Sequence, residues 1–151
     1  DARTCQAVAQ MWARIGVRTE VQALPWATYS ARTSRQDFNM RMGGWGSVTG
    51  EASYMLVNIF GTYDRERRRG ASNSSRWSSP ALDALTERAA ATLDDTQREA
   101  MLRDAVRMVT VDDQVMLPLF QLVNFWAARR GVTYEARMDE RTTAMGAKPA
   151  N

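Results

Sequence analysis

The chain has 151 residues, of which 44% are hydrophobic and 25% are charged, a composition ordinary for one globular domain, here residues 1–151. Nineteen arginines and one lysine against 17 acids give a formal charge of +3, and the absence of histidine excludes histidine-based triads, general bases and metal sites. The single cysteine excludes an internal disulfide, and the long apolar run at residues 115–127 is too short for a membrane span.

The chain begins with a predicted helix and a predicted strand. Apolar residues recur at helical spacing at Val8, at Met11 or Trp12, and at Ile15, and Gly16 stands where a left-handed helix cap is expected. Through residues 17–23 apolar side chains alternate with polar ones, which is typical of a half-buried strand.

A second helix and a second strand follow. Pro25 suits the first turn of a helix that carries Trp26 and Tyr29 and ends near residues 35–37. The alternation at residues 38–42 predicts another strand. A strand, a helix and a strand in this order form a βαβ unit with parallel strands and a right-handed crossover. The predicted fold class is therefore α/β.

The candidate site is the Gly-Trp loop, residues 43–53, which follows the second predicted strand. Gly44 and Gly46 let the backbone approach a ligand, and Trp45 offers a flat apolar wall. Ser47 adds a hydroxyl, and Glu51 is the nearest carboxylate. Open α/β sheets place their ligands at the carboxyl ends of parallel strands, so this loop is predicted to bind a ligand. A glycine-rich turn with a partly buried tryptophan explains the same residues equally well.

Residues 61–79 have no clear period and predict a long surface loop. Within it, residues 61–75 are expected to be the least restrained internal segment of the chain, because apolar anchors are few. The run at 65–69 holds four arginines and raises nucleic-acid binding as an alternative. A solvated loop explains the run more simply, because acids are interleaved elsewhere and no recognition motif accompanies it. Nucleic acid is therefore not an expected partner.

Two amphipathic helices are predicted next. Ser79 caps the first helix with Pro80 in its opening turn, and Asp94 with Gln97 forms a capping-box-like pair for the second. Both helices are expected to pack on the predicted sheet. The side chains expected to face inward are Leu82, Leu85, Ala89, Met101, Ala105, Met108 and Val109.

The last part of the chain is predicted to contain strands. Residues 115–127, interrupted by Pro118, predict a buried strand or two strands with a kink. Residues 132–134 predict an edge strand, and the tail from Arg141 is expected to be irregular.

Catalysis has little support in the sequence. Cys5 lacks a histidine base, and the acid pairs at 94–95 and 112–113 are explained by helix capping and dipole compensation. Phosphate-binding and dinucleotide-binding motifs are absent. We therefore expect no enzyme, no catalytic residue, no metal and no cofactor. The opening on Asp1 without a signal peptide suggests a processed chain or an excised fragment.

Short motifs cover nearly the whole chain: AQMWARIGV at 9–17, LPWATY at 24–29, GWGS at 44–47, RWSSP at 76–80, LPL at 117–119, WAARRGVTY at 126–134 and DERT at 139–142. In this order they resemble the C-terminal portion of the family 5 extracytoplasmic solute-binding proteins, the dipeptide, oligopeptide and nickel receptors of ABC importers.

The resemblance implies the C-terminal lobe of a periplasmic-binding-protein type II-like fold, with a mixed sheet flanked by helices. The whole receptor would close over a small solute and deliver it to ABC permease membrane subunits. The missing N-terminal lobe of the same protein would supply the other half of the cleft. The expected location is periplasmic, or extracytoplasmic and membrane-anchored if the full-length protein is a lipoprotein. In relatives the Gly-Trp loop lines the cleft.

The sequence departs from the resemblance at the expected ligand carboxylate. Val48 stands where dipeptide-type receptors place an acid, and Ser79 replaces a common asparagine. A peptide-like solute is expected, with a sugar, an opine-like compound or a capped peptide left open. The alternative function is a truncated receptor-like module that acts in protein–protein interaction, which a partner lobe upstream in the same gene would argue against. A basic nucleic-acid-binding domain is a distant alternative.

Overall fold

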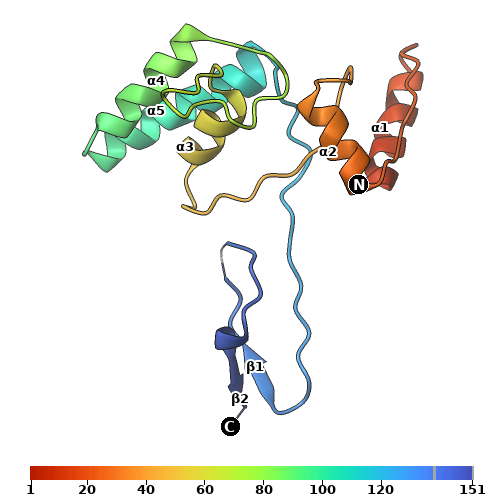
Figure 1. The fold of residues 1–151 in the computed structure, drawn as a ribbon, viewed down its shortest axis with the longest axis vertical. Helices are drawn as coiled ribbons and strands as arrows, with labels where there is room; N and C mark the ends of the chain where they lie inside the picture. The colour runs from red at the N-terminus through yellow and green to blue at the C-terminus, as the bar shows by residue number, and fades with distance from the viewer. Residues whose placement is uncertain (138, 151) are drawn as a thin grey trace. The chain divides into compact units, whose positions relative to one another are not determined.

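The computed structural model describes residues 1–137 and 139–150, and the chain divides into two compact units, Asp1–Gly44 and Trp45–Asn151 (Figure 1). Unit 1 holds helices α1 (Ala2–Ala13) and α2 (Trp26–Ser34). The elements of unit 2 are α3 (Ala52–Met55), the π-helical turn η1 (Leu56–Phe60), α4 (Pro80–Ala91), α5 (Asp95–Arg107), the π-helical turn η2 (Met108–Asp112), β1 (Val132–Tyr134), the 3₁₀ turn η3 (Ala144–Gly146) and β2 (Ala147–Pro149).

Both helices of unit 1 lie where the sequence predicted them. After α1 the chain turns at Gly16, whose φ is +83°. The N–H groups of Gly16 and Val17 donate to the carbonyl oxygens of Ala13 and Trp12 at 3.1 and 3.0 Å. These are the two hydrogen bonds of a Schellman motif, and the left-handed conformation favours glycine. The predicted cap is confirmed.

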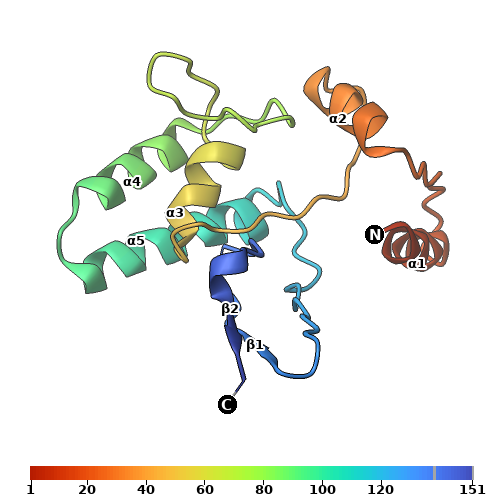
Figure 2. The ribbon, with the colours of Figure 1, turned by 60° about the horizontal axis from the view of Figure 1, so that its bottom comes forward.

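The two strands predicted in unit 1 are not formed. Residues 17–23 and 38–42 carry no regular structure, and Figure 2 shows them as irregular connections. Side chains of α2 hold these segments instead. Arg32 donates to Gln22 Oε1 at 2.6 Å, and the Tyr29 hydroxyl donates to the Met42 carbonyl oxygen at 2.7 Å.

The prediction of a parallel βαβ unit is therefore wrong. Alternating apolar side chains indicate one buried face, but a strand forms only where a neighbouring backbone supplies partners for its N–H and C=O groups. Since the second strand is not formed, the Gly-Trp loop does not follow the carboxyl end of a parallel strand.

The core of unit 2 is helical. Helices α4 and α5 lie side by side in both ribbon views (Figure 1, Figure 2) and pack against each other and against residues 52–60. Their apolar faces meet in a helix-on-helix core, so the expectation that they cover a sheet is wrong. The buried core residues are Leu56, Phe60, Leu82, Ala89, Leu102, Ala105 and Val109, with the predicted Leu85, Met101 and Met108 packed against them.

Both core helices begin as the sequence predicted. Ser79 Oγ accepts a hydrogen bond from the Leu82 N–H at 3.2 Å, and Pro80 occupies the first turn of α4. Asp94 Oδ1 accepts from the Gln97 N–H at 2.8 Å. Each cap satisfies a backbone donor that has no partner inside its helix.

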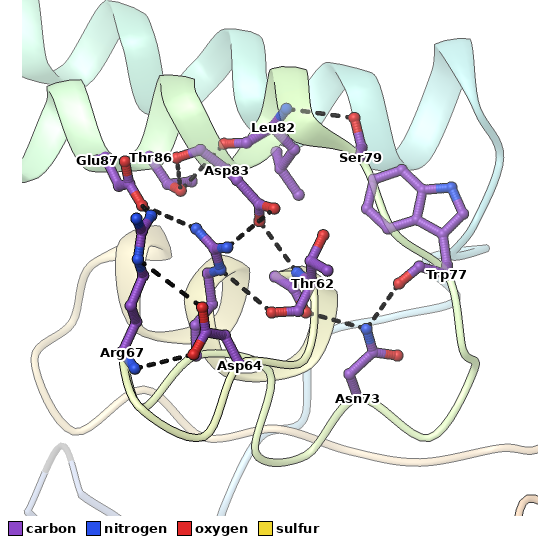
Figure 3. Close-up of polar contacts among 12 residues, drawn as sticks. Thr62, Asp64, Arg67, Asn73, Trp77, Ser79, Leu82, Asp83, Thr86 and Glu87 are labelled. Carbon is purple, nitrogen blue, oxygen red and sulfur yellow. Dashed lines mark hydrogen bonds and ion pairs between the residues drawn. The ribbon is translucent and has the colours of Figure 1, made fainter.

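The segment of residues 61–79 is anchored to α4, chiefly through Arg69 and Asp83. The Arg69 side chain is 12% exposed, with its Nη2 3.3 Å from Asp83 Oδ2 and its Nη1 2.8 Å from Glu87 Oε1. Arg69 Nε also donates to the Thr62 carbonyl oxygen at 3.1 Å. Figure 3 shows Asp83 accepting from the Thr62 N–H, at 3.0 Å.

Further hydrogen bonds close the segment on itself. Asn73 Nδ2 donates to the carbonyl oxygens of Gly61 and Trp77 at 3.0 and 2.8 Å (Figure 3). Asp64 and Arg69 exchange two backbone hydrogen bonds of 3.0 Å. Polar anchors thus take the place of the apolar ones that residues 61–75 lack, and the expected low restraint of this segment stays a prediction.

The same contacts neutralise part of the arginine run. Arg67 and Arg69 form ion pairs with acids of their own unit, Asp64, Asp83 and Glu87. Paired guanidinium groups contribute little to a field that would attract a polyanion. Two arginines of the run therefore form ion pairs within unit 2.

The long apolar run at residues 115–127 is not the buried strand that the sequence predicted. It carries no regular structure, and most of its apolar side chains are exposed, with Phe125 at 90%. An apolar run indicates a tendency to be buried, but it does not supply the surface that buries it.

The edge strand predicted at residues 132–134 is confirmed as β1. It pairs antiparallel with β2, Thr133 lying opposite Lys148. Since β2 lies in the tail from Arg141, the expectation of an irregular tail is wrong for that part. The regular structure of the described residues is thus helical apart from one small two-stranded sheet. This is compatible with the broad α/β class, although the described part of the chain has no mixed sheet flanked by helices.

Candidate functional site

The Gly-Trp loop carries a half-exposed tryptophan. Trp45 is 38% exposed, whereas no core residue of unit 2 exceeds 6%. Its ring centroid lies 5.4 Å from that of Tyr54 on α3, with the ring planes inclined by 36°. Within unit 2 the indole is therefore a surface group that packs against one aromatic ring, that of Tyr54. Gly44, also a predicted site residue, is the last residue of unit 1.

A compact turn follows Trp45 and Gly46. The Glu51 N–H donates to Ser47 Oγ at 3.2 Å and to Thr49 Oγ1 at 3.3 Å, while Ser47 Oγ donates to the Glu51 carbonyl oxygen at 2.9 Å. Gly50 closes the turn with φ of +68°, a conformation that favours glycine. The predicted Ser47 hydroxyl is thus already engaged in holding the loop.

Glu51, the predicted ligand carboxylate, is also engaged inside the unit. Its Oε1 lies 3.5 Å from Arg98 Nε on α5, and its Oε2 accepts from Ser53 Oγ at 3.1 Å. Arg98 forms a second ion pair with Asp95, at 3.2 Å. The structure therefore brings Glu51 beside Ser47 and into contact with α5.

An open groove of about 590 Å³ runs between the loop and α5. Ion pairs line it, and an apolar wall is formed by Ala52, Leu102 and Val106. The groove therefore offers both apolar surface and ion-paired polar groups. The remaining lining residues are Thr49, Gly50, Glu51, Asp95, Arg98, Glu99 and Arg103.

Sequence reasoning missed two residues of this site. Tyr54 lies directly after the Gly-Trp loop, and an aromatic residue so close to Trp45 was a usable signal. Arg98 lies far along the chain in an amphipathic helix, where an exposed arginine is ordinary. Its pairing with Glu51 depends on how α5 packs, which the sequence pattern does not report.

The arrangement supplies binding groups rather than a reacting pair. An indole, a phenol, hydroxyls and an ion-paired carboxylate can contact and orient a solute. Within residues 1–137 and 139–150, no group of three or more Cys, Asp or Glu side chains could hold a metal ion. None of the described helices is long and apolar enough to cross a membrane.

Comparison with known proteins shows what the sequence is similar to. Residues 1–66, which include the Gly-Trp loop, match the family of bacterial extracellular solute-binding proteins, family 5, middle region. The chain is also 26% identical over 132 residues to the di/tripeptide-binding protein 2 of Pseudomonas aeruginosa (strain UCBPP-PA14), covering 87% of this chain and 24% of that protein. Over residues 1–66 the chain is similar to the family 5 solute-binding proteins.

Two further relatives belong to the same comparison. One is the probable D,D-dipeptide-binding periplasmic protein DdpA of Escherichia coli (strain K12), 29% identical over 108 residues, which are 72% of this chain and 20% of the relative. The other is the heme-binding protein A of Haemophilus influenzae (strain ATCC 51907 / DSM 11121 / KW20 / Rd), 24% identical over 123 residues, which are 82% and 22%.

The chain spans between 20% and 24% of the length of these relatives. The resemblance seen in the sequence motifs is confirmed. The relatives carry the names of binding proteins rather than of enzymes.

Proposed function

We propose that this chain is part of the substrate-binding component of an ABC-type importer, which captures a peptide-like solute and delivers it to a membrane permease. The observation that carries the proposal is Trp45, which is exposed beside Tyr54 and lies within the residues 1–66 that match family 5. Trp45 is exposed beside the half-buried Tyr54, and its ring leaves apolar surface in water unless a ligand or another part of the protein covers it.

A peptide-like solute is the class that the relatives favour. Two of the three relatives described above are named as binding a dipeptide or a di/tripeptide, and the third as binding heme. None of these names supports the sugar or opine-like ligand that the sequence left open. The periplasm, named for the Escherichia coli relative, is the proposed location.

The chain is proposed to act together with the rest of a two-lobed receptor. It covers at most 24% of the length of its relatives, and a solute that is held on one side only keeps much of its surface wet. We place it in the second lobe, with Gly44, Trp45, Gly46, Ser47 and Glu51 on the ligand side. The other lobe and the permease subunits are its proposed partners.

The test is binding of di- and tripeptides by the complete receptor that carries this chain, measured by calorimetry. Trp45→Ala is expected to weaken binding by about 1–3 kcal/mol, the contribution of one stacked aromatic ring and its buried area. Trp26→Ala is the matched control, because Trp26 is 77% exposed and stacks on Tyr29 at 5.6 Å outside the loop. Equal effects of the two substitutions, or no effect of Trp45→Ala, would contradict the proposed site.

A further inference from the structure

We propose that Arg98 sets the charge preference of this site, by neutralising Glu51 so that the site disfavours a charged ammonium group. The inference rests on the proposed function and names the ligand chemistry of the same site. A peptide-like solute with an uncharged or capped amino end would then be preferred at the Gly-Trp loop.

The first argument is that both carboxylate oxygens of Glu51 already have partners. Oε1 faces Arg98 Nε at 3.5 Å, and Oε2 accepts the Ser53 hydroxyl at 3.1 Å. The Glu51 side chain is 30% exposed, so a ligand can reach it. An ammonium group that bound there would have to displace or share these partners.

The second argument is that Arg98 is held in place by the fold. It lies on α5, whose Leu102 and Ala105 are buried in the core. Its Nη2 contacts Asp95 Oδ1 at 3.2 Å while its Nε faces Glu51. A guanidinium has donors in a fixed planar fork, so one arginine can serve both acids without moving.

The third argument is electrostatic. A ligand ammonium at Glu51 would lie beside the Arg98 guanidinium, and the repulsion between these like charges offsets the attraction of the Glu51 carboxylate. Asp95, the second partner of Arg98, is 90% exposed, so water and salt screen its charge more strongly. An amide or an acetylated amine carries no charge and avoids this repulsion. Arg98 therefore competes with a ligand ammonium for the Glu51 carboxylate.

The experiment compares two ligands, alanyl-alanine and N-acetyl-alanyl-alanine, by calorimetry with the complete receptor. In R98M the preference for the free amine over the acetylated peptide is expected to rise about tenfold, at the lower end for a charge-assisted hydrogen bond because both side chains are partly exposed. The double variant E51Q/R98M should lose this gain. R98K keeps the positive charge and should stay within about threefold of the parent.

The matched control is R103M. Arg103 lies on the same helix and lines the same groove, but it pairs with Glu99 at 2.6 Å. If R103M shifts the ligand preference as much as R98M does, the effect is one of net charge and the proposal is overturned. An unchanged preference in R98M overturns it as well, provided that circular dichroism shows a folded variant.

A measurement without ligand separates this inference from the proposed function. Urea unfolding of the 151-residue chain with E51Q, R98M and both should show coupling, the double variant losing less stability than the sum of the single ones. If the receptor binds neither peptide, the proposed function fails. In that case, absence of coupling between Glu51 and Arg98 overturns the inference too, while coupling supports the ion pair on which it depends.

Discussion

Replacing Asp83 with asparagine tests how the segment of residues 61–79 is held on α4. Asp83 Oδ1 accepts from the Thr62 N–H at 3.0 Å, and its Oδ2 lies 3.3 Å from Arg69 Nη2. An asparagine can keep the first contact. At the second position its amide nitrogen would face another donor, so the ion pair is lost while the shape of the side chain is kept.

The expected loss of stability is about 3 kcal/mol. Removing one partner of a buried ion pair costs roughly 3–5 kcal/mol, because the other charge stays buried without compensation. The side chains of Asp83 and Arg69 are nearly buried, at 10% and 12% exposure. The lower end applies because Arg69 keeps Glu87, which is 54% exposed and lies 2.8 Å from Arg69 Nη1. Glu87→Gln, the control, removes an exposed partner and should cost less than about 1 kcal/mol.

Native-state amide exchange is the suitable assay, because it reports on this segment separately from the other unit. The Gly70 and Ser72 N–H groups donate to the carbonyl oxygens of Val57 and Asn58, both at 2.9 Å. A loss of 3 kcal/mol should speed their exchange about 100-fold in Asp83→Asn. Exchange that is unchanged, or changed equally by Glu87→Gln, would refute the view that Asp83 anchors the segment.

Two further predictions concern a helix cap and an acid. Ser79→Ala should lower the free energy of unfolding by about 1 kcal/mol through loss of the bond to the Leu82 N–H, while Ser78→Ala at the exposed neighbour should change it little; similar losses would contradict the cap. The side-chain hydrogen bond from Arg137 lowers the pKa of Asp139 from its usual 3.8 to about 2. The ionised Asp139 carboxylate therefore contributes stability above pH 4, and this contribution is lost as the pH falls toward 2. Carboxyl NMR should give a titration midpoint near 2 that rises toward 4 in Arg137→Gln, and a midpoint near 4 in the parent would disprove the contact.

The helices were predictable because their signals are local. Ser79, Pro80 and Asp94 begin helices through contacts within one turn, and Gly16 ends one through its own backbone conformation. The predicted inward faces of α4 and α5 were also found, since helical spacing fixes which side chains share a face.

The strands and the partners of the site were not predictable in this way. Residues 17–23 and 38–42 have the alternation of strands, but whether they form a sheet depends on neighbours that the pattern does not contain. The loop was found from its glycines and tryptophan, whereas Arg98 meets Glu51 only through the packing of α5. A pattern of residue types reports what a segment tends to do, and tertiary contacts decide which partner it finds.

Arg69 shows why one basic residue cannot stand in for another in this chain. Its single head group spans a main-chain oxygen of Thr62 and the carboxylates of Asp83 and Glu87, three acceptors that belong to two stretches of sequence. A lysine has the same charge, but its compact ammonium is a point rather than a planar fork. A lysine would therefore lack the planar set of donors that reaches all three acceptors at once. The near-exclusive use of arginine among the bases has, at this position, a geometric reason that a count of charges would miss.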